Sequence, residues 1–165
     1  PPVRNQWWNP EGTYTGYHGY WASDFEHVDP HFGSLQDWRN VADALHDRGM
    51  RLIQDVVVNH AGDWVLVTDS GSAVRDLPVA GWMHPDSGVY HRTPPISDYG
   101  DAKQLLSHEL AGLDDFRTES ERVRVAMRAI YRKWLEEGGA DGLRFDTHKY
   151  VERSFWPAFL EGTPG

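Results

Sequence analysis

The sequence contains no cysteine, so disulfide bonds, thiol nucleophiles and cysteine-ligated metal sites are excluded. Basic residues are also scarce: 16 Lys and Arg stand against 25 Asp and Glu, for a net charge of −9. Nucleic acids and anionic membrane surfaces require a basic face, and we therefore predict no nucleic-acid partner. No apolar run approaches the roughly 18 residues of a membrane-spanning helix, so we predict no membrane segment.

Apolar residues make up 39% of the 165 residues and aromatic residues 13%, which is enough for one hydrophobic core. The chain starts at Pro1 without an initiator Met or a signal peptide, and it ends in the turn-forming residues 163–165. We interpret it as an internal fragment of a longer protein. Its localisation stays open, because cysteine-free proteins occur in both oxidising and reducing compartments.

The first third of the chain combines an irregular stretch with one helix and one strand. Residues 1–33 are rich in Gly, His and aromatic residues, which predicts a long loop with one short extended stretch near 20–25. Ser34 followed by Asp37 is typical of a helix N-cap, and apolar residues then recur at helical spacing. The β-branched run 50–58 predicts a buried strand.

The rest of the chain predicts an insertion followed by a second strand between two helices. Residues 61–113 lack a sustained period and are too long for an ordinary loop, so we expect an irregular inserted subdomain. The pattern from Thr118 to Glu121 resembles a capping box and opens a helix that ends at the Gly pair 138–139. A strand at 142–146 and a helix at about 151–160 follow. This order indicates an α/β fold with a parallel sheet.

Arg144 and Asp146 stand two positions apart in the second strand. Their side chains should therefore share one face, with Phe145 on the other. Asp55, inside the first strand, is a plausible partner for Arg144, because a buried carboxylate is costly unless it is paired. A carboxylate beside a fixed cation stays ionised, as a carboxylate nucleophile must, although such pairs are more often simple salt bridges.

Four short blocks occur in a characteristic order. They are HGYWASDF with VDPHFGS within 18–34, DVVVNH at 55–60, GLDDF at 112–116 and GLRFDTHKYV at 142–151. Together they resemble blocks of the α-amylase family of glycoside hydrolases. The resemblance implies a catalytic (β/α)8 TIM barrel, of which this chain holds about strands 2–4 and their helices. Residues 1–60 and 114–165 would be barrel segments, and 61–113 the inserted B domain.

The resemblance also implies the roles of individual residues. Asp146 would be the catalytic nucleophile and Arg144 the residue that orients it. His60 would hydrogen-bond the sugar at the bond to be cleaved, and Tyr20 would stack on it with its hydroxyl in solvent. The remaining substrate-binding residues would be His18, Trp21 and Lys149.

A structural calcium ion is the cofactor that the resemblance implies. Its ligands would be Asn59, Asp115 and the backbone carbonyl of Tyr150, and calcium does prefer such oxygen ligands. Asp114 is a rival for the role of Asp115, because the block reads LDDF where the family more often has a Pro-Asp-Leu-Asn type of sequence. The other histidines show no metal-ligand spacing, and we assign them no role: His27, His31, His46, His84, His91 and His108.

The implied function is a retaining glycosidase that cleaves α-1,4 bonds of starch, glycogen or maltodextrins, with an oligo- or polysaccharide as partner. The acid/base glutamate and the third catalytic aspartate of the family would fall beyond Gly165, so we expect the fragment alone to be inactive. Two alternatives stay open. One is a transglycosylase or isomerase of the trehalose synthase, sucrose phosphorylase or branching type, and the other is a non-catalytic amylase-like ectodomain.

Overall fold

The computed structural model describes residues 1–9, 11–68, 71–74 and 81–161. The strands are β1 (Val3–Asn5), β2 (Ala22–Val28), β3 (Ile53–Val56), β4 (Val65–Thr68), β5 (Gly71–Val74) and β6 (Gly142–Phe145). The α-helices are α1 (Leu35–His46), α2 (Ala102–Ser107), α3 (Glu121–Glu136) and α4 (Phe155–Leu160). Three 3₁₀ turns complete the order: η1 (Gly81–Met83), η2 (Pro85–Ser87) and η3 (His148–Tyr150).

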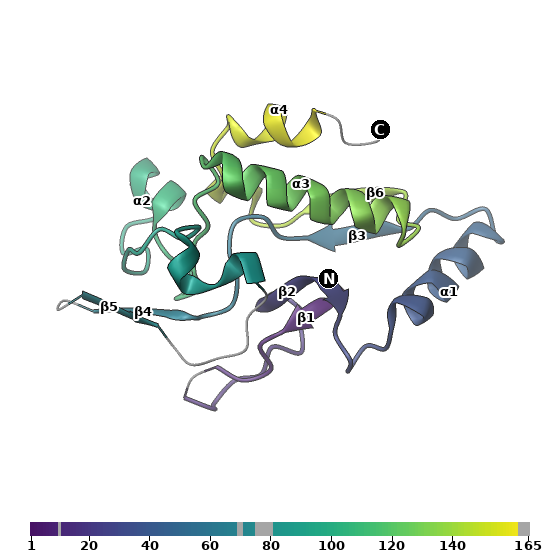
Figure 1. Ribbon diagram of the computed structural model, residues 1–165, viewed down its shortest axis with the longest axis horizontal. Helices are drawn as coiled ribbons and strands as arrows, with labels where there is room; N and C mark the ends of the chain where they lie inside the picture. Colours follow the sequence, from purple (N-terminus) through teal and green to yellow (C-terminus); the bar gives the residue numbers. More distant parts are fainter. Residues whose placement is uncertain (10, 69–70, 75–80, 162–165) are drawn as a thin grey trace.

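Strands β3 and β6 pair in parallel, with Asp55 directly opposite Arg144. This confirms the α/β arrangement predicted from the order of elements. Both strands are shorter than expected, at four residues each. Helices α3 and α4 both pack against this strand pair, because Phe145 of β6 meets Tyr131 of α3 and also Phe159 of α4. Figure 1 shows both helices on the same side of the strands.

Residues 1–33 are not the long loop that the sequence predicts. They contain an antiparallel pair in which β1 runs beside β2, with irregularities in the register. The extended stretch near 20–25 is confirmed as part of β2, whereas β1 went unpredicted. A three-residue strand has no periodicity of its own, and it forms here because its backbone groups find partners on β2.

The two predicted helix starts had different outcomes. Ser34 and Asp37 form a complete capping box at the start of α1, with each side chain bonded to the backbone of the other residue. The predicted box from Thr118 to Glu121 is wrong. Helix α3 begins after Ser120 without a side-chain cap, and the Thr118 hydroxyl donates instead to the carboxylate of Glu152. A distant carboxylate has replaced the local capping interaction.

The apolar stripe of α3 forms the centre of the core, as its spacing predicts. Its buried residues are Val123, Met127, Ile130, Tyr131 and Trp134. Phe145 points away from the Arg144 face and packs edge-on against Tyr131, Trp156 and Phe159. The last helix is shorter than predicted. Residues 151–154 are irregular after η3, and only the segment from Phe155 onward is helical.

Asp141 joins the end of α1 to the start of β3 from the turn before β6. Its carboxylate accepts hydrogen bonds from the backbone N–H of Leu52 (2.8 Å), from Arg51 (2.6 Å) and from the ring of His46 (2.7 Å). These hydrogen bonds, that of the Leu52 backbone first, hold the pKa of Asp141 well below its ordinary value.

The described part of 61–113 contains the β4–β5 hairpin, η1, η2 and α2, with irregular chain between them. The hairpin extends away from the helical layers (Figure 1). The lack of a sustained period in the sequence agrees with this mixture of short elements. Among the described residues, no helix combines the length and apolar character needed to cross a bilayer.

Candidate active site

A continuous set of polar contacts lies where β3 and β6 end. Nη1 of Arg144 contacts both carboxylate oxygens of Asp55, at 2.9 and 2.7 Å, and Nη2 lies 3.1 Å from a carboxylate oxygen of Asp146. The Tyr20 hydroxyl donates to Asp55 at 2.7 Å. One guanidinium therefore bridges two carboxylates, and one of these carboxylates also holds a tyrosine.

The backbone fixes this arrangement. Parallel pairing sets Arg144 opposite Asp55, and the Asp146 N–H continues the ladder by donating to the Val56 carbonyl at 2.9 Å. Thr147 then takes a left-handed conformation, with φ of 55°, and turns the chain into η3. The hydrogen bond and the charge of Asp55 raise the pKa of Arg144, so the guanidinium remains charged. The predicted contact between Asp55 and Arg144 is confirmed. Asp55 also accepts the hydroxyl of Tyr20, a contact that the sequence did not indicate.

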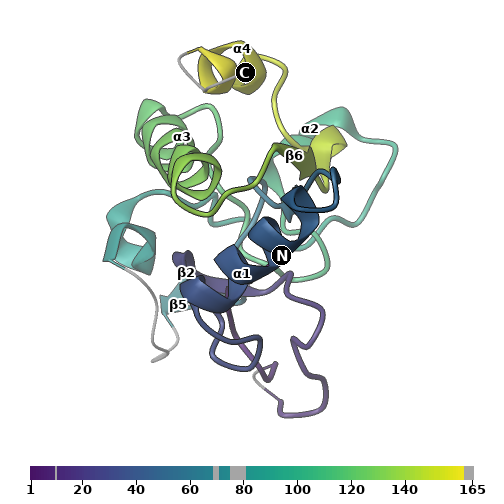
Figure 2. The same ribbon diagram turned by 90° about the vertical axis from the view of Figure 1, so that its right-hand side faces the viewer.

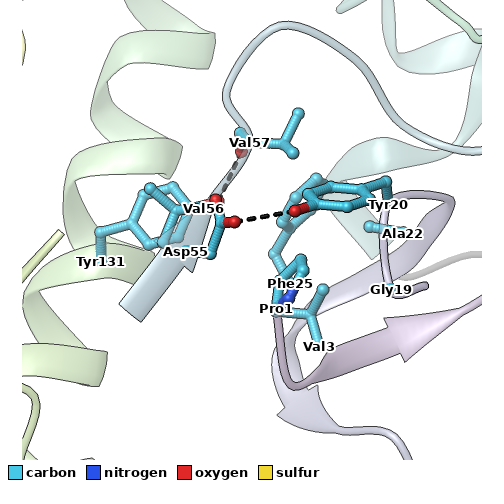
Figure 3. Close-up of a pocket in the computed structure, with 10 residues that line it drawn as sticks. All are labelled: Pro1, Val3, Gly19, Tyr20, Ala22, Phe25, Asp55, Val56, Val57 and Tyr131. Carbon is cyan, nitrogen blue, oxygen red and sulfur yellow. Dashed lines mark hydrogen bonds between the residues drawn. The ribbon is translucent and has the colours of Figure 1, made fainter. Parts of the chain in front are cut away.

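Tyr20 lies in the segment before β2, and its hydroxyl group contacts Asp55, as Figure 3 shows. Its hydroxyl does not lie free in solvent, as the sequence analysis expected, because it is bonded to Asp55. That hydrogen bond is the main cause of a raised pKa for Tyr20. The ring of His18 stacks on Tyr20 at a centroid distance of 5.7 Å and meets Trp21 edge-on at 5.0 Å. The structure therefore brings together all three aromatic residues that the sequence singled out.

His60 is buried beside this cluster. Burial lowers its pKa to about 4, and the Tyr20 backbone and the charge of Asp146 oppose that shift. The ring is therefore neutral near pH 7. Its Nδ1 lies 3.4 Å from the side-chain amide of Asn59, and its Nε2 has no hydrogen-bond partner within the described part of the chain. A neutral imidazole with one nitrogen unpaired can exchange a hydrogen bond with a ligand hydroxyl.

Asn59 and Asp115 lie on two segments joined by a bridge between His60 and Asp115. The side-chain oxygen of Asn59 is buried and finds no hydrogen-bond partner among the residues that the structure describes. Burial raises the pKa of Asp115 to about 7, although a hydrogen bond from His91 works in the opposite direction. A hard cation would satisfy the amide oxygen and favour the ionised carboxylate, so these two groups fit calcium. Within the described residues, no group of three or more His, Cys, Asp or Glu side chains is arranged to hold a metal.

Asp114 is also buried, but its surroundings differ. Its carboxylate accepts the backbone N–H of Trp64 at 2.6 Å and that of Val65 at 3.0 Å. Burial nevertheless raises its pKa to about 8. These bonds tie the start of β4 to the segment before α3, which accounts for Asp114 without a metal.

His91 belongs to this region, although the sequence gave it no role. Its Nδ1 lies 2.7 Å from the Asp115 carboxylate and its Nε2 lies 3.2 Å from that of Glu119. Burial lowers the pKa of His91, but the hydrogen bonds and charges of the two carboxylates outweigh it and raise the pKa overall. The contact spans 24 residues of sequence, and no local spacing could have revealed it.

Lys149 and Tyr150 occupy η3, the turn that follows Asp146 and Thr147. The Lys149 amine lies 4.8 Å from the centre of the Tyr150 ring. Among the described residues, neither side chain is recorded in contact with the Asp55–Arg144–Asp146 network. Lys149 and Tyr150 lie close to Asp146 in sequence. The side chain of Lys149 is exposed, so its positive charge is accessible to a ligand.

Comparison with known proteins gives consistent results. The family model described as "Alpha amylase, catalytic domain" matches residues 4–161. An α-amylase of Streptomyces lividans is 32% identical over 184 residues, covering 86% of this chain and 20% of that protein. A cyclomaltodextrin glucanotransferase of Klebsiella oxytoca is 28% identical, covering 94% of this chain and 24% of that protein.

Comparison with solved structures agrees with the sequence matches. The crystal structure of an α-amylase from Geobacillus thermoleovorans, complexed with acarbose, has a TM-score of 0.79 and 33% identity. The match covers 99% of this chain and 32% of that one. The chain thus spans about a fifth to a third of the length of the relatives it matches. The likeness supports the α/β fold.

Proposed function

Because the chain belongs to the α-amylase family of glycoside hydrolases, we propose that it supplies part of the catalytic site of a retaining enzyme acting on α-1,4-glucans. Residues 1–60 and 114–165 would contribute about strands 2–4 of the TIM barrel, and 61–113 its inserted B domain. The parallel pairing of β3 and β6 supports the barrel assignment. The β4–β5 hairpin and the short helices between β3 and β6 support the assignment of an inserted domain.

One observation carries the proposal: Arg144 holds Asp146 while its other nitrogen is fixed by Asp55. In the first step the Asp146 carboxylate attacks the anomeric carbon of the glucan. The glycosidic bond breaks, and the leaving oxygen takes a proton from a general acid elsewhere in the full-length protein. In the second step water gives a proton to the same group, now acting as a base, and attacks the same carbon; the bond to Asp146 breaks and the anomeric configuration is retained. Arg144 holds the Asp146 carboxylate in position for the attack.

The aromatic residues and His60 position the sugar in this proposal. Tyr20 presents its ring to the sugar next to the scissile bond, and the hydrogen bond to Asp55 fixes that ring. His18 and Trp21 line the sugar-binding site beside Tyr20. His60 is neutral near pH 7, and its unpaired Nε2 meets a sugar hydroxyl. Lys149 contacts the sugar on the leaving-group side.

Calcium would have a structural role in this proposal. Asn59 and Asp115 would hold it, with the backbone carbonyl of Tyr150 as a further ligand. The unpartnered Asn59 oxygen and the buried Asp115 carboxylate support the first two ligands. When bound, the ion supplies a positive charge that offsets buried negative charge and ties the end of β3 to the segment before α3.

The function is tested with Asp146→Asn in the full-length protein. The substitution removes the nucleophile and keeps its shape, so hydrolysis of α-1,4-glucans should fall at least about 10³-fold while glucan binding persists. Full activity in the variant would remove Asp146 from the mechanism. Product analysis separates the alternatives, because shorter glucans with new reducing ends indicate hydrolysis, whereas cyclic or lengthened glucans indicate the glucanotransferase activity named for one relative.

A further inference from the structure

Tyr131 of α3 reaches the strand that carries Asp55. Helix α3 is the green helix of Figures 1 and 2, and Figure 3 shows the Tyr131 ring beside Asp55. The Tyr131 hydroxyl donates a hydrogen bond to the backbone carbonyl of Val57 at 2.5 Å. The residue is only 1% exposed. None of the proposed catalytic steps uses this buried hydroxyl.

The hydrogen bond lies where the pairing of β3 with β6 ends. Val56 is the last paired residue of β3, and its carbonyl accepts the N–H of Asp146 at 2.9 Å. The next carbonyl, that of Val57, accepts the Tyr131 hydroxyl instead. Burial raises the pKa of Tyr131, so the hydroxyl keeps its proton near pH 7 and remains a donor. Tyr131 therefore extends the support of β3 by one residue beyond the strand pair.

The ring of Tyr131 contacts the other strand. It packs edge-on against Phe145, with the ring centroids 6.5 Å apart and the planes at 81°. Phe145 stands between Arg144 and Asp146 in the chain. A packed interior transmits small displacements, so a movement of this ring pair also moves the residues on either side of Phe145. One side chain thus contacts β3 just after Asp55 and β6 just before Asp146.

The segment that carries His60 has anchors of its own. The carbonyl of Asn59 accepts the N–H of Phe116 at 2.8 Å, and His60 forms a backbone bridge with Asp115. These bonds join the segment to the chain before α3 and do not involve Tyr131. Loss of the Tyr131 hydroxyl should therefore shift the end of β3 relative to β6 and leave the position of His60 unchanged.

We propose that Tyr131 is a positioning residue for the Arg144–Asp146 pair, because its hydroxyl holds the end of β3 and Asp55 transmits that position to Arg144. The contacts of 2.9 and 2.7 Å between Asp55 and Arg144 form this link. The inference rests on the proposed function, because the reaction is the one proposed there. It predicts that the Tyr131 hydroxyl affects kcat much more than KM.

The test compares Tyr131→Phe with Tyr90→Phe in the full-length protein. Tyr90 is the matched control, because it is also buried and its hydroxyl also donates to a backbone carbonyl, that of Met83, at 2.8 Å. This pair lies between β5 and α2, away from the strand ends. Each substitution leaves a buried carbonyl without its donor, so both should lower the melting temperature to a similar extent.

The kinetic effects of the two variants should differ. A displacement of about 1 Å can cost about 10²-fold in rate, and the loss of one hydrogen bond should cause a smaller shift. Tyr131→Phe should therefore lower kcat on an α-1,4-glucan about tenfold and keep KM within about twofold. Tyr90→Phe should keep both within about twofold of wild type. Circular dichroism at the assay temperature confirms that each variant is folded.

A double substitution tests the route through Asp55. Arg144→Lys breaks the simultaneous contact with Asp55 and Asp146, so Tyr131→Phe added to it should cost clearly less than about tenfold. An undiminished loss in the double variant would show that the hydroxyl acts elsewhere in the molecule and would overturn the proposal.

The outcomes separate this inference from the proposed function. A wild-type protein that is inactive on α-1,4-glucans would refute the proposed function, and the role of Tyr131 would fall with it. An active protein in which Tyr131→Phe keeps the wild-type kcat would overturn the role of Tyr131 alone. Equal losses of kcat in Tyr131→Phe and Tyr90→Phe, or a Tyr131→Phe protein that does not fold, would show that the hydroxyl only stabilises the fold.

Discussion

Replacing Arg144 by lysine separates the structural from the catalytic contribution of its ion pairs. The guanidinium contacts Asp55 through one nitrogen and Asp146 through the other. A lysine has a single nitrogen and cannot hold both carboxylates in this geometry. The side chain of Arg144 is 56% exposed, and exposed ion pairs contribute little to stability. We therefore expect the free energy of unfolding to change little.

The expected effect on activity is much larger. If Arg144 orients the nucleophile, its loss misplaces the Asp146 carboxylate, and a displacement of about 1 Å can cost about 10²-fold in rate. Arg144→Lys should therefore lower kcat on an α-1,4-glucan about 100-fold in the full-length protein. Arg51→Lys is the control, because Arg51 also pairs with an aspartate but is 78% exposed and outside the site.

The two readouts are denaturant unfolding and steady-state kinetics on the same preparations. Arg144→Lys activity within about threefold of wild type would refute the orienting role. A loss of several kcal/mol of stability would show that the guanidinium mainly holds the fold, and the kinetic loss would then carry no mechanistic meaning.

Three further predictions concern the metal, the core and acid stability. Chelation of calcium should lower the melting temperature of the full-length protein, and Asn59→Ala should abolish that shift; an unchanged melting temperature would remove calcium from the account. Met127→Ala should cost about 2–5 kcal/mol in denaturant unfolding, because Met127 is fully buried, whereas Val125→Ala on the exposed side of α3 should cost less than about 0.5 kcal/mol. Asp141 has a depressed pKa, so its stabilising effect is present above its unfolded pKa of 3.8 and is lost as the pH falls below that value. Asp141→Asn should therefore destabilise at pH 7 and differ less from wild type at pH 3, and a constant difference in urea unfolding would contradict this.

The sequence predicted the parts of the fold that local patterns determine. The Ser34 capping box, the apolar stripe of α3 and the shared face of Arg144 and Asp146 all follow from residues a few positions apart. The parallel pairing of β3 and β6 followed from the order of elements, and it accounts for the contact between Asp55 and Arg144.

The features that escaped prediction depend on distant partners. His91 reaches Asp115 across 24 residues, and no spacing rule links them. Thr118 has the pattern of a cap, but the Glu152 carboxylate captures its hydroxyl. The Tyr20 hydroxyl was expected in solvent because its sequence neighbours give no sign of Asp55, which lies 35 residues away. Such contacts are decided by tertiary packing, and local propensity cannot reveal them.

The most direct test of the central proposal is to trap the covalent intermediate. A fluorinated glycosyl fluoride that forms a slowly hydrolysed glycosyl–enzyme should be incubated with the full-length protein, and the labelled peptide identified by mass spectrometry. The account predicts a single adduct on the peptide that contains Asp146, and none in Asp146→Asn. An adduct on another carboxylate, or products of inverted anomeric configuration, would contradict it.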